Sequence, residues 1–178
     1  MSRSSIKVIT ELAVFAAIAI VLDKIPLFTM PQGGSVSLVM LPILLVALRH
    51  GWRLGVLAGL IVGLVQLFFG GYFLNVFQVF LDYGLAYAGV GLGGAFAQAF
   101  TRKPKISYLL GASLLGGGCR LLGSFLAGVI FYADYAPKGI PVWLYSLTYN
   151  ASYMIPSIVL CASLLVVIYK ARPEFFRK

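Results

Sequence analysis

The chain is poor in charged residues, and acidic residues are the scarcest of them. Of its 178 residues only 11% are charged, with 14 Lys and Arg against 5 Asp and Glu, whereas 61% are hydrophobic. So few polar side chains cannot cover the surface of a water-soluble globule. We therefore expect an integral membrane protein, and the long apolar runs are typical of an all-α fold of membrane helices.

Histidine and cysteine, which build many catalytic and metal centres, are also rare. Cys119 and Cys161 stand in apolar runs without metal-type spacing, so we interpret both as small core residues. The sequence has no G-x-x-x-x-G-K-[ST] loop, no H-E-x-x-H motif and no pair of intramembrane carboxylates for Mg²⁺. Ser124 has no nearby His to activate it. We expect no enzymatic activity, no metal and no cofactor, and no ATP hydrolysis by this chain alone.

Short polar or Gly/Pro breaks divide the apolar sequence into candidate membrane helices. At roughly 20 apolar residues each, the length suits one bundle of about six transmembrane helices. No Pro/Ser-rich or charge-rich linker interrupts residues 1–178, so we expect a single domain. The predicted helices cover residues 6–26, 36–49, 53–69, 75–100, 106–133 and 142–170.

The positions of the basic residues predict the orientation in the membrane. Lys24 and Lys138 are the only basic residues in the breaks of one side. The other side holds Arg3, Lys7, Arg49, Arg53, Arg102, Lys103, Lys105, Lys170, Arg172, Arg177 and Lys178. Because cytoplasmic loops carry the excess of Lys and Arg, both termini are expected in the cytoplasm. The net charge of +9 is then explained by membrane orientation, and no nucleic-acid partner is expected.

Polar residues on three predicted helices fall at similar depths in the outer half of the bilayer. Asp82 and Arg120 are the only charged residues that this topology places well inside the membrane. With a helical rise of 1.5 Å per residue, Asp82 lies about 10 Å deep, Ser124 and Asn150 about 12 Å and Arg120 about 18 Å. Charged groups at membrane depth need a partner, a water-filled cavity or a ligand. We therefore predict one enclosed pocket that opens outward.

Aromatic residues are concentrated around the same layer. They are Tyr72, Tyr83, Tyr132, Tyr135, Trp143, Tyr145 and Tyr149. An interfacial belt explains Tyr135 and Trp143 equally well, whereas Tyr83 and Tyr149 lie too deep for a belt and fit a pocket wall. Aromatic rings around a carboxylate attract a flat organic cation through their quadrupoles. The pocket therefore favours a cationic aromatic ligand.

Arg120 would repel a cation unless a negative charge compensates it. On neighbouring helices Asp82 and Arg120 could pair, since the Arg side chain can span their difference in depth of about 8 Å. Such a pair would hold the Asp82 carboxylate ionised and oriented. A purely structural ion pair without a role in ligand binding remains the alternative.

Small residues recur at four-residue spacing, which allows helices to approach closely. Gly55, Gly59 and Gly63 form one such series, and Gly89, Gly93 and Ala97 form another; both are interpreted as internal packing. Ala13 and Ala17 have the same spacing in the first helix. For these two alanines, internal packing and a docking face for another membrane protein are both open.

Several segments, taken in order, resemble the thiamine-specific substrate-binding subunits, or S components, of energy-coupling factor (ECF) vitamin transporters. The segments are T-E-L-A-V-F-A-A at 10–17, P-Q-G-G-S-V-S-L at 31–38, L-D-Y at 81–83, F-L-A-G-V-I-F-Y at 125–132, Y-A-P-K-G at 135–139 and V-W-L-Y-S-L-T-Y-N at 142–150. Their order and spacing distinguish the chain from S components for riboflavin, biotin or folate.

The resemblance implies a multi-pass subunit of the bacterial cell membrane that captures thiamine from outside. It implies that Asp82 binds the cationic and aminopyrimidine groups, with Arg120 as the basic partner of Asp82. The same resemblance implies that Tyr83 follows the acid in the site, that Tyr132 stacks on the ligand, that Tyr145 and Asn150 form hydrogen bonds with it, and that Tyr72 belongs to the lid. Ser124 is added as a candidate contact because of its depth. Some relatives have a His near the position of Ser124, and Ser cannot replace a His in stacking.

The resemblance also implies a lid and protein partners. The loops after the first and third helices cover the pocket, with Gln32, Gly33 and Gly34 in the first of them. Because relatives carry a Trp in this loop, we expect this segment to act through its backbone groups. Ala13 and Ala17 correspond to the motif that docks on a transmembrane coupling subunit. Two partner ATPases then power transport, while the S component tilts in the bilayer.

Two other functional classes, and one variant of this function, stay open at this point. A self-sufficient ion-coupled secondary transporter typically has internal repeats with broken helices at the midplane, and none is evident. A membrane enzyme needs a catalytic constellation, which the sequence lacks. An S component for another cationic or aromatic vitamin is the third alternative.

Overall fold

The computed structural model describes residues 3–176, and most of this part of the chain is helical. Arg177 and Lys178, which contributed to the predicted orientation, lie outside the described residues. The elements in chain order are α1 (Arg3–Lys24), β1 (Phe28–Thr29), β2 (Ser35–Val36), α2 (Met40–His50), α3 (Trp52–Phe68), α4 (Val76–Val79), the π-helix η1 (Phe80–Leu85), α5 (Ala86–Val90), the 3-10 helix η2 (Gly91–Phe96), α6 (Ala97–Arg102), α7 (Ile106–Phe131), η3 (Ala133–Tyr135), α8 (Val142–Ala171) and η4 (Pro173–Phe176).

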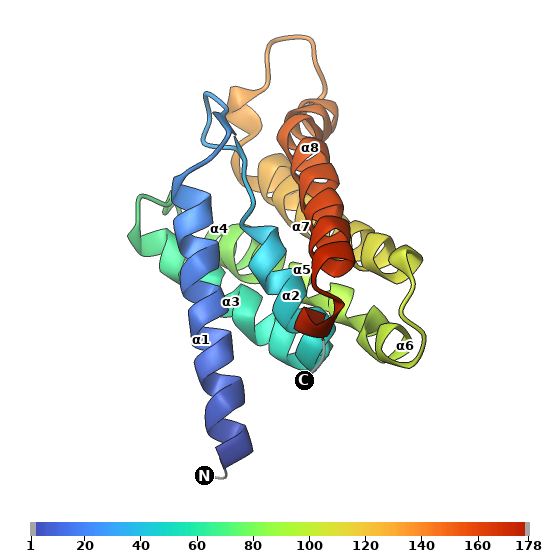
Figure 1. The fold of residues 1–178 in the computed structure, drawn as a ribbon. Coiled ribbons are helices and arrows are strands. Elements are labelled where there is room, and N and C mark those ends of the chain that lie inside the picture. Colours follow the sequence, from blue (N-terminus) through green and yellow to red (C-terminus); the bar gives the residue numbers. More distant parts are fainter. Residues whose placement is uncertain (1–2, 177–178) are drawn as a thin grey trace.

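The helix α2 lies at the centre of the bundle. Every residue from Met40 to Leu48 is buried, because α1, α3, α8 and η2 all pack against α2. A helix that is apolar on all sides requires neighbours on all sides. The hydrophobic core is therefore built around α2, and the other helices wrap around it (Figure 1).

Most predicted helices agree with the structure to within a few residues, but one begins later than predicted and another is less regular than a single α-helix. The helix predicted at 36–49 begins only at Met40, because Ser35 and Val36 form a strand that pairs antiparallel with Phe28 and Thr29. The segment predicted as one helix at 75–100 consists of five successive elements, α4, η1, α5, η2 and α6, which together form the composite segment Val76–Arg102. Its π-helical turn contains Asp82, and such turns inside helices are frequent at functional sites.

The glycines of α3 let this helix lie directly on the composite segment, as their spacing predicted. A Cβ atom on Gly59 would collide with the Tyr87 carbonyl oxygen, and one on Gly63 with the Tyr83 carbonyl oxygen. Gly55 and Gly91 face each other in the same manner further along the contact. This backbone-to-backbone packing fixes the position of η1, and with it the position of Asp82, relative to α3.

Within residues 3–176, three helical stretches are long and apolar enough to cross a membrane. They are Val76–Arg102, Ile106–Phe131 and Val142–Ala171, and α2 and α3 are shorter apolar helices. The structure therefore agrees with a multi-pass membrane protein, while the count of six transmembrane helices stays a prediction.

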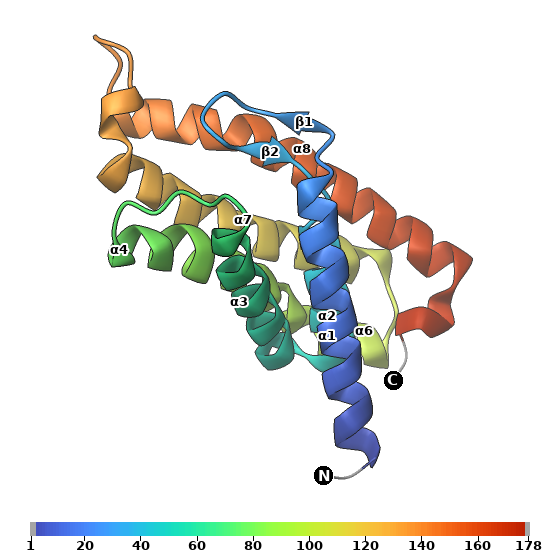
Figure 2. The ribbon, with the colours of Figure 1, turned by 90° about the vertical axis from the view of Figure 1, so that its left-hand side faces the viewer.

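Both ends of the described chain lie at the same end of the bundle. Figures 1 and 2 show the N and C ends at the bottom of both views. The β1–β2 hairpin and the loop between α7 and α8 lie at the opposite end. This arrangement agrees with two termini on one side of the membrane; that this side is the cytoplasm stays a prediction.

We expect Gly63→Ala to destabilise the protein, because the new methyl group forces α3 away from the Tyr83 carbonyl. Overpacking of this kind costs about 1–3 kcal/mol, so thermal unfolding in detergent should start at a lower temperature. Gly118→Ala is the matched control, since nothing lies within 4 Å of a Cβ at this position of α7. Equal melting temperatures for the two variants would contradict the proposed role of the close contact.

Candidate ligand-binding site

A cavity of about 250 Å³ lies beside the β1–β2 hairpin and the ends of α7 and α8 that face it. Five parts of the chain line it: the end of α1 with the hairpin, the end of α3 with its following loop, the composite segment, α7 and α8. The lining residues include all of the predicted contacts and lid residues, namely Asp82, Tyr83, Tyr132, Tyr145, Asn150, Tyr72, Ser124, Arg120, Gln32, Gly33 and Gly34. The structure thus brings together residues more than 100 positions apart. That they bind a ligand stays a prediction.

Asp82 is held in the cavity wall by two hydrogen bonds to one of its oxygens. The Gln78 Nε2 atom donates to Asp82 Oδ2 over 2.9 Å, and the Tyr132 hydroxyl donates to the same oxygen over 3.0 Å. Within residues 3–176 no donor contacts Oδ1. The carboxylate is therefore oriented by α4 and the end of α7, while one oxygen stays available to a molecule in the cavity.

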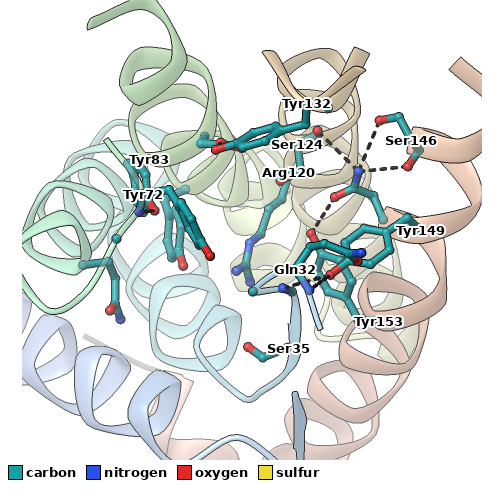
Figure 3. A pocket seen from close by; sticks show the side chains of 18 of the residues that line it. Gln32, Ser35, Tyr72, Tyr83, Arg120, Ser124, Tyr132, Ser146, Tyr149 and Tyr153 are labelled. Carbon is teal, nitrogen blue, oxygen red and sulfur yellow. Dashed lines mark hydrogen bonds between the residues drawn. The ribbon is translucent and has the colours of Figure 1, made fainter. Parts of the chain in front are cut away.

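The β1–β2 hairpin covers one side of the cavity and is fastened to α8 through its backbone. The Tyr149 hydroxyl accepts hydrogen bonds from the backbone N–H of Gln32 (3.1 Å) and from that of Gly34 (3.4 Å). Gly34 lies so close to the Tyr153 ring that a Cβ atom would overlap it. Figure 3 shows the segment at Gln32 beside Tyr149 and Tyr153. This geometry agrees with the expectation that the segment acts through backbone groups.

Tyrosine rings form most of the remaining wall. Tyr145 stacks on Tyr149 with 5.9 Å between ring centroids, and Tyr149 meets Tyr153 edge to face at the same distance. On the opposite wall the Tyr83 hydroxyl accepts a hydrogen bond of 2.7 Å from the Tyr72 backbone N–H. Tyr72, 52% exposed, stands at the rim. The aromatic cluster predicted from the sequence therefore surrounds the cavity.

Comparison with known sequences and structures identifies the family. The sequence model of the thiamine transporter protein family matches residues 9–177. The chain belongs to this family.

Individual members of the thiamine transporter family are similar along nearly the whole chain. The thiamine transporter ThiT of Bacillus subtilis is 39% identical over 94% of this chain and 92% of its own. ThiT of Lacticaseibacillus paracasei is 33% identical over 95% of this chain and 90% of its own. A solved structure of ThiT from Listeria monocytogenes superposes with a TM-score of 0.89 at 29% identity, covering 99% of this chain and 100% of that chain.

Membership of a transporter family confirms two of the predictions. The resemblance to thiamine-specific transport proteins is confirmed. The expectation that the chain is not an enzyme is confirmed as well, since the family is described as one of transporters.

The predicted ion pair between Asp82 and Arg120 is not present in this family member. Within the described residues no carboxylate oxygen lies within 4 Å of the Arg120 guanidinium, which instead packs over the Tyr87 ring at 4.5 Å. Asp23, at the end of α1, is a second acid that lines the cavity together with Arg120. The prediction missed Asp23 because its distance from Arg120 along the chain hides their proximity in the cavity.

Asp23 also connects the two ends of the hairpin. The Ser37 hydroxyl, just after β2, donates a hydrogen bond of 3.3 Å to Asp23 Oδ1, just before β1. Beside it, the Lys24 ammonium donates to the Phe69 carbonyl oxygen over 2.6 Å and so joins the ends of α1 and α3. A single Asp near the end of an apolar helix gave no sequence signal for this role.

Asn150 and Ser124 lie in the cavity wall, but the structure shows Asn150 already engaged within the protein. Its Nδ2 donates to the Ser146 carbonyl oxygen (2.9 Å) and, more weakly, to the Ser124 carbonyl oxygen (3.4 Å). Its Oδ1 accepts a hydrogen bond of 2.6 Å from the Tyr153 hydroxyl. Asn150 thereby joins α7 to α8, and a direct contact with a ligand stays a prediction.

The exposed face of α1 contains the predicted docking residues. Ala13 and Ala17 are exposed, whereas Leu12, Ala16 and Ala19 face the core. The alternative that Ala13 and Ala17 serve internal packing is therefore wrong, because their side chains do not face another helix of the described chain.

We expect Tyr149→Phe to loosen the hairpin, because the change removes the acceptor of two backbone hydrogen bonds. Amide hydrogen exchange in the ligand-free protein should become faster in residues 28–36, by roughly fivefold for about 1 kcal/mol of lost stabilisation. Gln32→Ala should leave the exchange rate unchanged, since only the backbone of Gln32 takes part. Faster exchange in the Gln32 variant but not in the Tyr149 variant would contradict this account.

Proposed function

We propose that the chain is the thiamine-binding S component of an ECF importer in the bacterial cell membrane. Members of its family are described as thiamine transporters. The observation that carries the proposal is the Asp82 carboxylate, oriented by Gln78 and Tyr132 and surrounded by tyrosine rings in the cavity. A carboxylate with one open oxygen among aromatic faces suits a heteroaromatic cation.

In this proposal the separation of Arg120 from Asp82 favours a cationic ligand. Asp23 lines the same cavity as Arg120 and is proposed to compensate its charge, which leaves Asp82 to attract the thiazolium and aminopyrimidine groups. Tyr132 offers a ring face for stacking, and the other lining residues contribute polar groups, namely Tyr83, Ser124, Tyr145 and Asn150. Tyr72 and the segment from Gln32 to Gly34 close the rim.

The proposed subunit has six membrane helices, and both ends of its chain lie in the cytoplasm. The shared position of the two ends and the basic residues near them support this orientation. The cavity then lies in the outer half of the membrane and captures its ligand from outside.

The partners are proposed to be a transmembrane coupling subunit and two ATPase subunits. Small exposed residues on α1 offer a flat face on which another helix can pack closely. Glu11 pairs with Arg49 and with His50, which fastens α1 to the end of α2, so that the face with Ala13 and Ala17 is presented on a fixed helix. Delivery inward then follows from movement of the whole subunit, driven by the ATPases.

Asp82→Asn should weaken thiamine binding, because the open carboxylate oxygen loses its negative charge. A hydrogen bond to a charged group contributes about 1.5–3 kcal/mol, which corresponds to roughly 10- to 150-fold in Kd. Calorimetric titration of purified, ligand-free protein with thiamine, pyridoxine and riboflavin measures this change. Asp134→Asn is the matched control, since Asp134 is exposed in η3.

The same titration separates the proposed ligand from its alternatives. Thiamine should bind in a one-to-one ratio and the other two vitamins should not. Tight binding of pyridoxine or riboflavin in place of thiamine would redirect the proposal to another vitamin, and unchanged affinity of Asp82→Asn would remove the acid from the site.

Ala13→Trp and Ala17→Trp should block transport without affecting binding. A bulky ring on the exposed face of α1 keeps a partner helix at a distance, so thiamine uptake should fall at least tenfold in cells that hold the coupling subunit and the ATPases. Val159→Trp is the control, since Val159 is exposed on α8. Concentrative uptake by the parent chain without ATPase partners would show a self-sufficient transporter instead.

A further inference from the structure

Gln66 is a buried amide in the cavity wall that nothing in the proposed site uses. It lies near the end of α3 and is only 3% exposed. It lines the same cavity as Asp82 and Arg120. Neither its Oε1 nor its Nε2 atom forms a hydrogen bond with any part of the chain that the structure describes.

The other buried amides of the cavity region are satisfied within the protein. Gln78 donates to Asp82 and accepts from the Leu74 backbone N–H over 3.1 Å. Asn150 uses both ends of its amide between α7 and α8. Buried polar groups nearly always have partners, and an unpaired amide costs stability. The unpaired Gln66 amide therefore needs a hydrogen-bond partner that is not part of the described chain.

The packing of α3 directs Gln66 to the ligand side of the bundle. Gly63, one turn earlier, is pressed against the Tyr83 carbonyl, and positions three residues apart share a helix face. Gln66 therefore faces the segment that carries Asp82 and Tyr83. Close backbone contact at Gly59 and Gly63, together with the bond from Lys24 to Phe69, holds this part of α3 in place.

We propose that Gln66 is a further ligand-binding residue, which recognises an uncharged polar edge of the bound molecule. This inference rests on the proposed function, in which Asp82 takes the positive charge of thiamine. An amide presents a donor beside an acceptor. It is complementary to a ring nitrogen next to an exocyclic amino group, as in the aminopyrimidine, and equally to a hydroxyl, as in the hydroxyethyl arm.

The test compares stability and affinity in Gln66→Met, which has nearly the same shape without polar atoms. Because the change removes an unpaired amide, the ligand-free protein should melt at the same or a higher temperature. Thiamine affinity should nevertheless fall by roughly 10- to 100-fold. A merely structural amide would lower stability, so a lower melting temperature with unchanged affinity overturns the proposal.

Two further variants make the comparison independent of folding problems. Gln66→Leu carries the same expectations should Gln66→Met fail to fold. Gln98→Met applies the same substitution to an exposed residue of α6 and should alter neither stability nor affinity.

Two thiamine analogues identify the edge that Gln66 contacts. One carries hydrogen in place of the pyrimidine amino group, and the other carries hydrogen in place of the hydroxyl. The parent chain should discriminate against one of them at least tenfold more strongly than Gln66→Met does. Equal discrimination by both proteins for both analogues shows that Gln66 does not contact the ligand and overturns the inference.

Failure of this inference and failure of the proposed function give different results. If the parent chain binds thiamine and Gln66→Met binds it equally well, only the role of Gln66 is wrong. If the parent chain binds no thiamine, both proposals fall.

Discussion

The placement of a carboxylate among apolar helices is the constraint on which the rest of this structure depends. At membrane depth a charged side chain costs roughly 2.5–3.5 kcal/mol on insertion scales, and the bilayer offers nothing to satisfy it. The protein places Asp82 in a π-helical turn and supplies Gln78 from one side and Tyr132 from the other. Both donors must come close, so the end of α7 must lie beside the composite segment. These two segments form one wall of the cavity, which the hairpin, α3 and α8 complete.

The charge balance of the cavity depends on a second acid. If Arg120 were paired with Asp82, the two charges would cancel and the site would offer no net charge to a ligand. In the proposed function Asp23, which lines the same cavity from the end of α1, compensates the arginine, and Asp82 stays available to the ligand. The same Asp23 binds Ser37 across the base of the hairpin. The electrostatic balance at the floor of the cavity is thereby coupled to the segment that covers it.

The sequence predicted the features that depend on distance along a helix. A rise of 1.5 Å per residue is fixed by backbone hydrogen bonds, so the depths of Asp82, Arg120 and Ser124 could be compared before any coordinates, and the structure places all three on one cavity. The glycine spacing predicted close helix packing for the same reason, because positions four apart share one face.

What the sequence could not predict depends on how segments face each other. The strands of the hairpin have two residues each, too few for an alternating pattern. The π-helical turn adds one residue to a helical turn without changing its apolar character. Asp23 and Gln66 are single polar residues at helix ends, and only the fold brings them to the cavity. The pairing of Asp82 with Arg120 was wrongly predicted because helical depth does not reveal the direction of a side chain, and Arg120 packs over the Tyr87 ring instead.

The distribution of strong and weak contacts around the cavity indicates how a ligand enters. On one wall, α3 and the composite segment touch backbone to backbone at Gly59 and Gly63, and separating them would break many contacts at once. On the other side the tip of the hairpin is attached by two hydrogen bonds to the Tyr149 hydroxyl, and its base is held by hydrogen bonds from Ser37 to Asp23 and Ser157. Opening is therefore easier at the hairpin than in the wall that carries Asp82. In the proposed function this asymmetry is useful, since the cover can move to admit thiamine while the carboxylate keeps its orientation. The exposed face of α1 lies outside this moving part, so a partner bound there does not compete with the opening of the cavity.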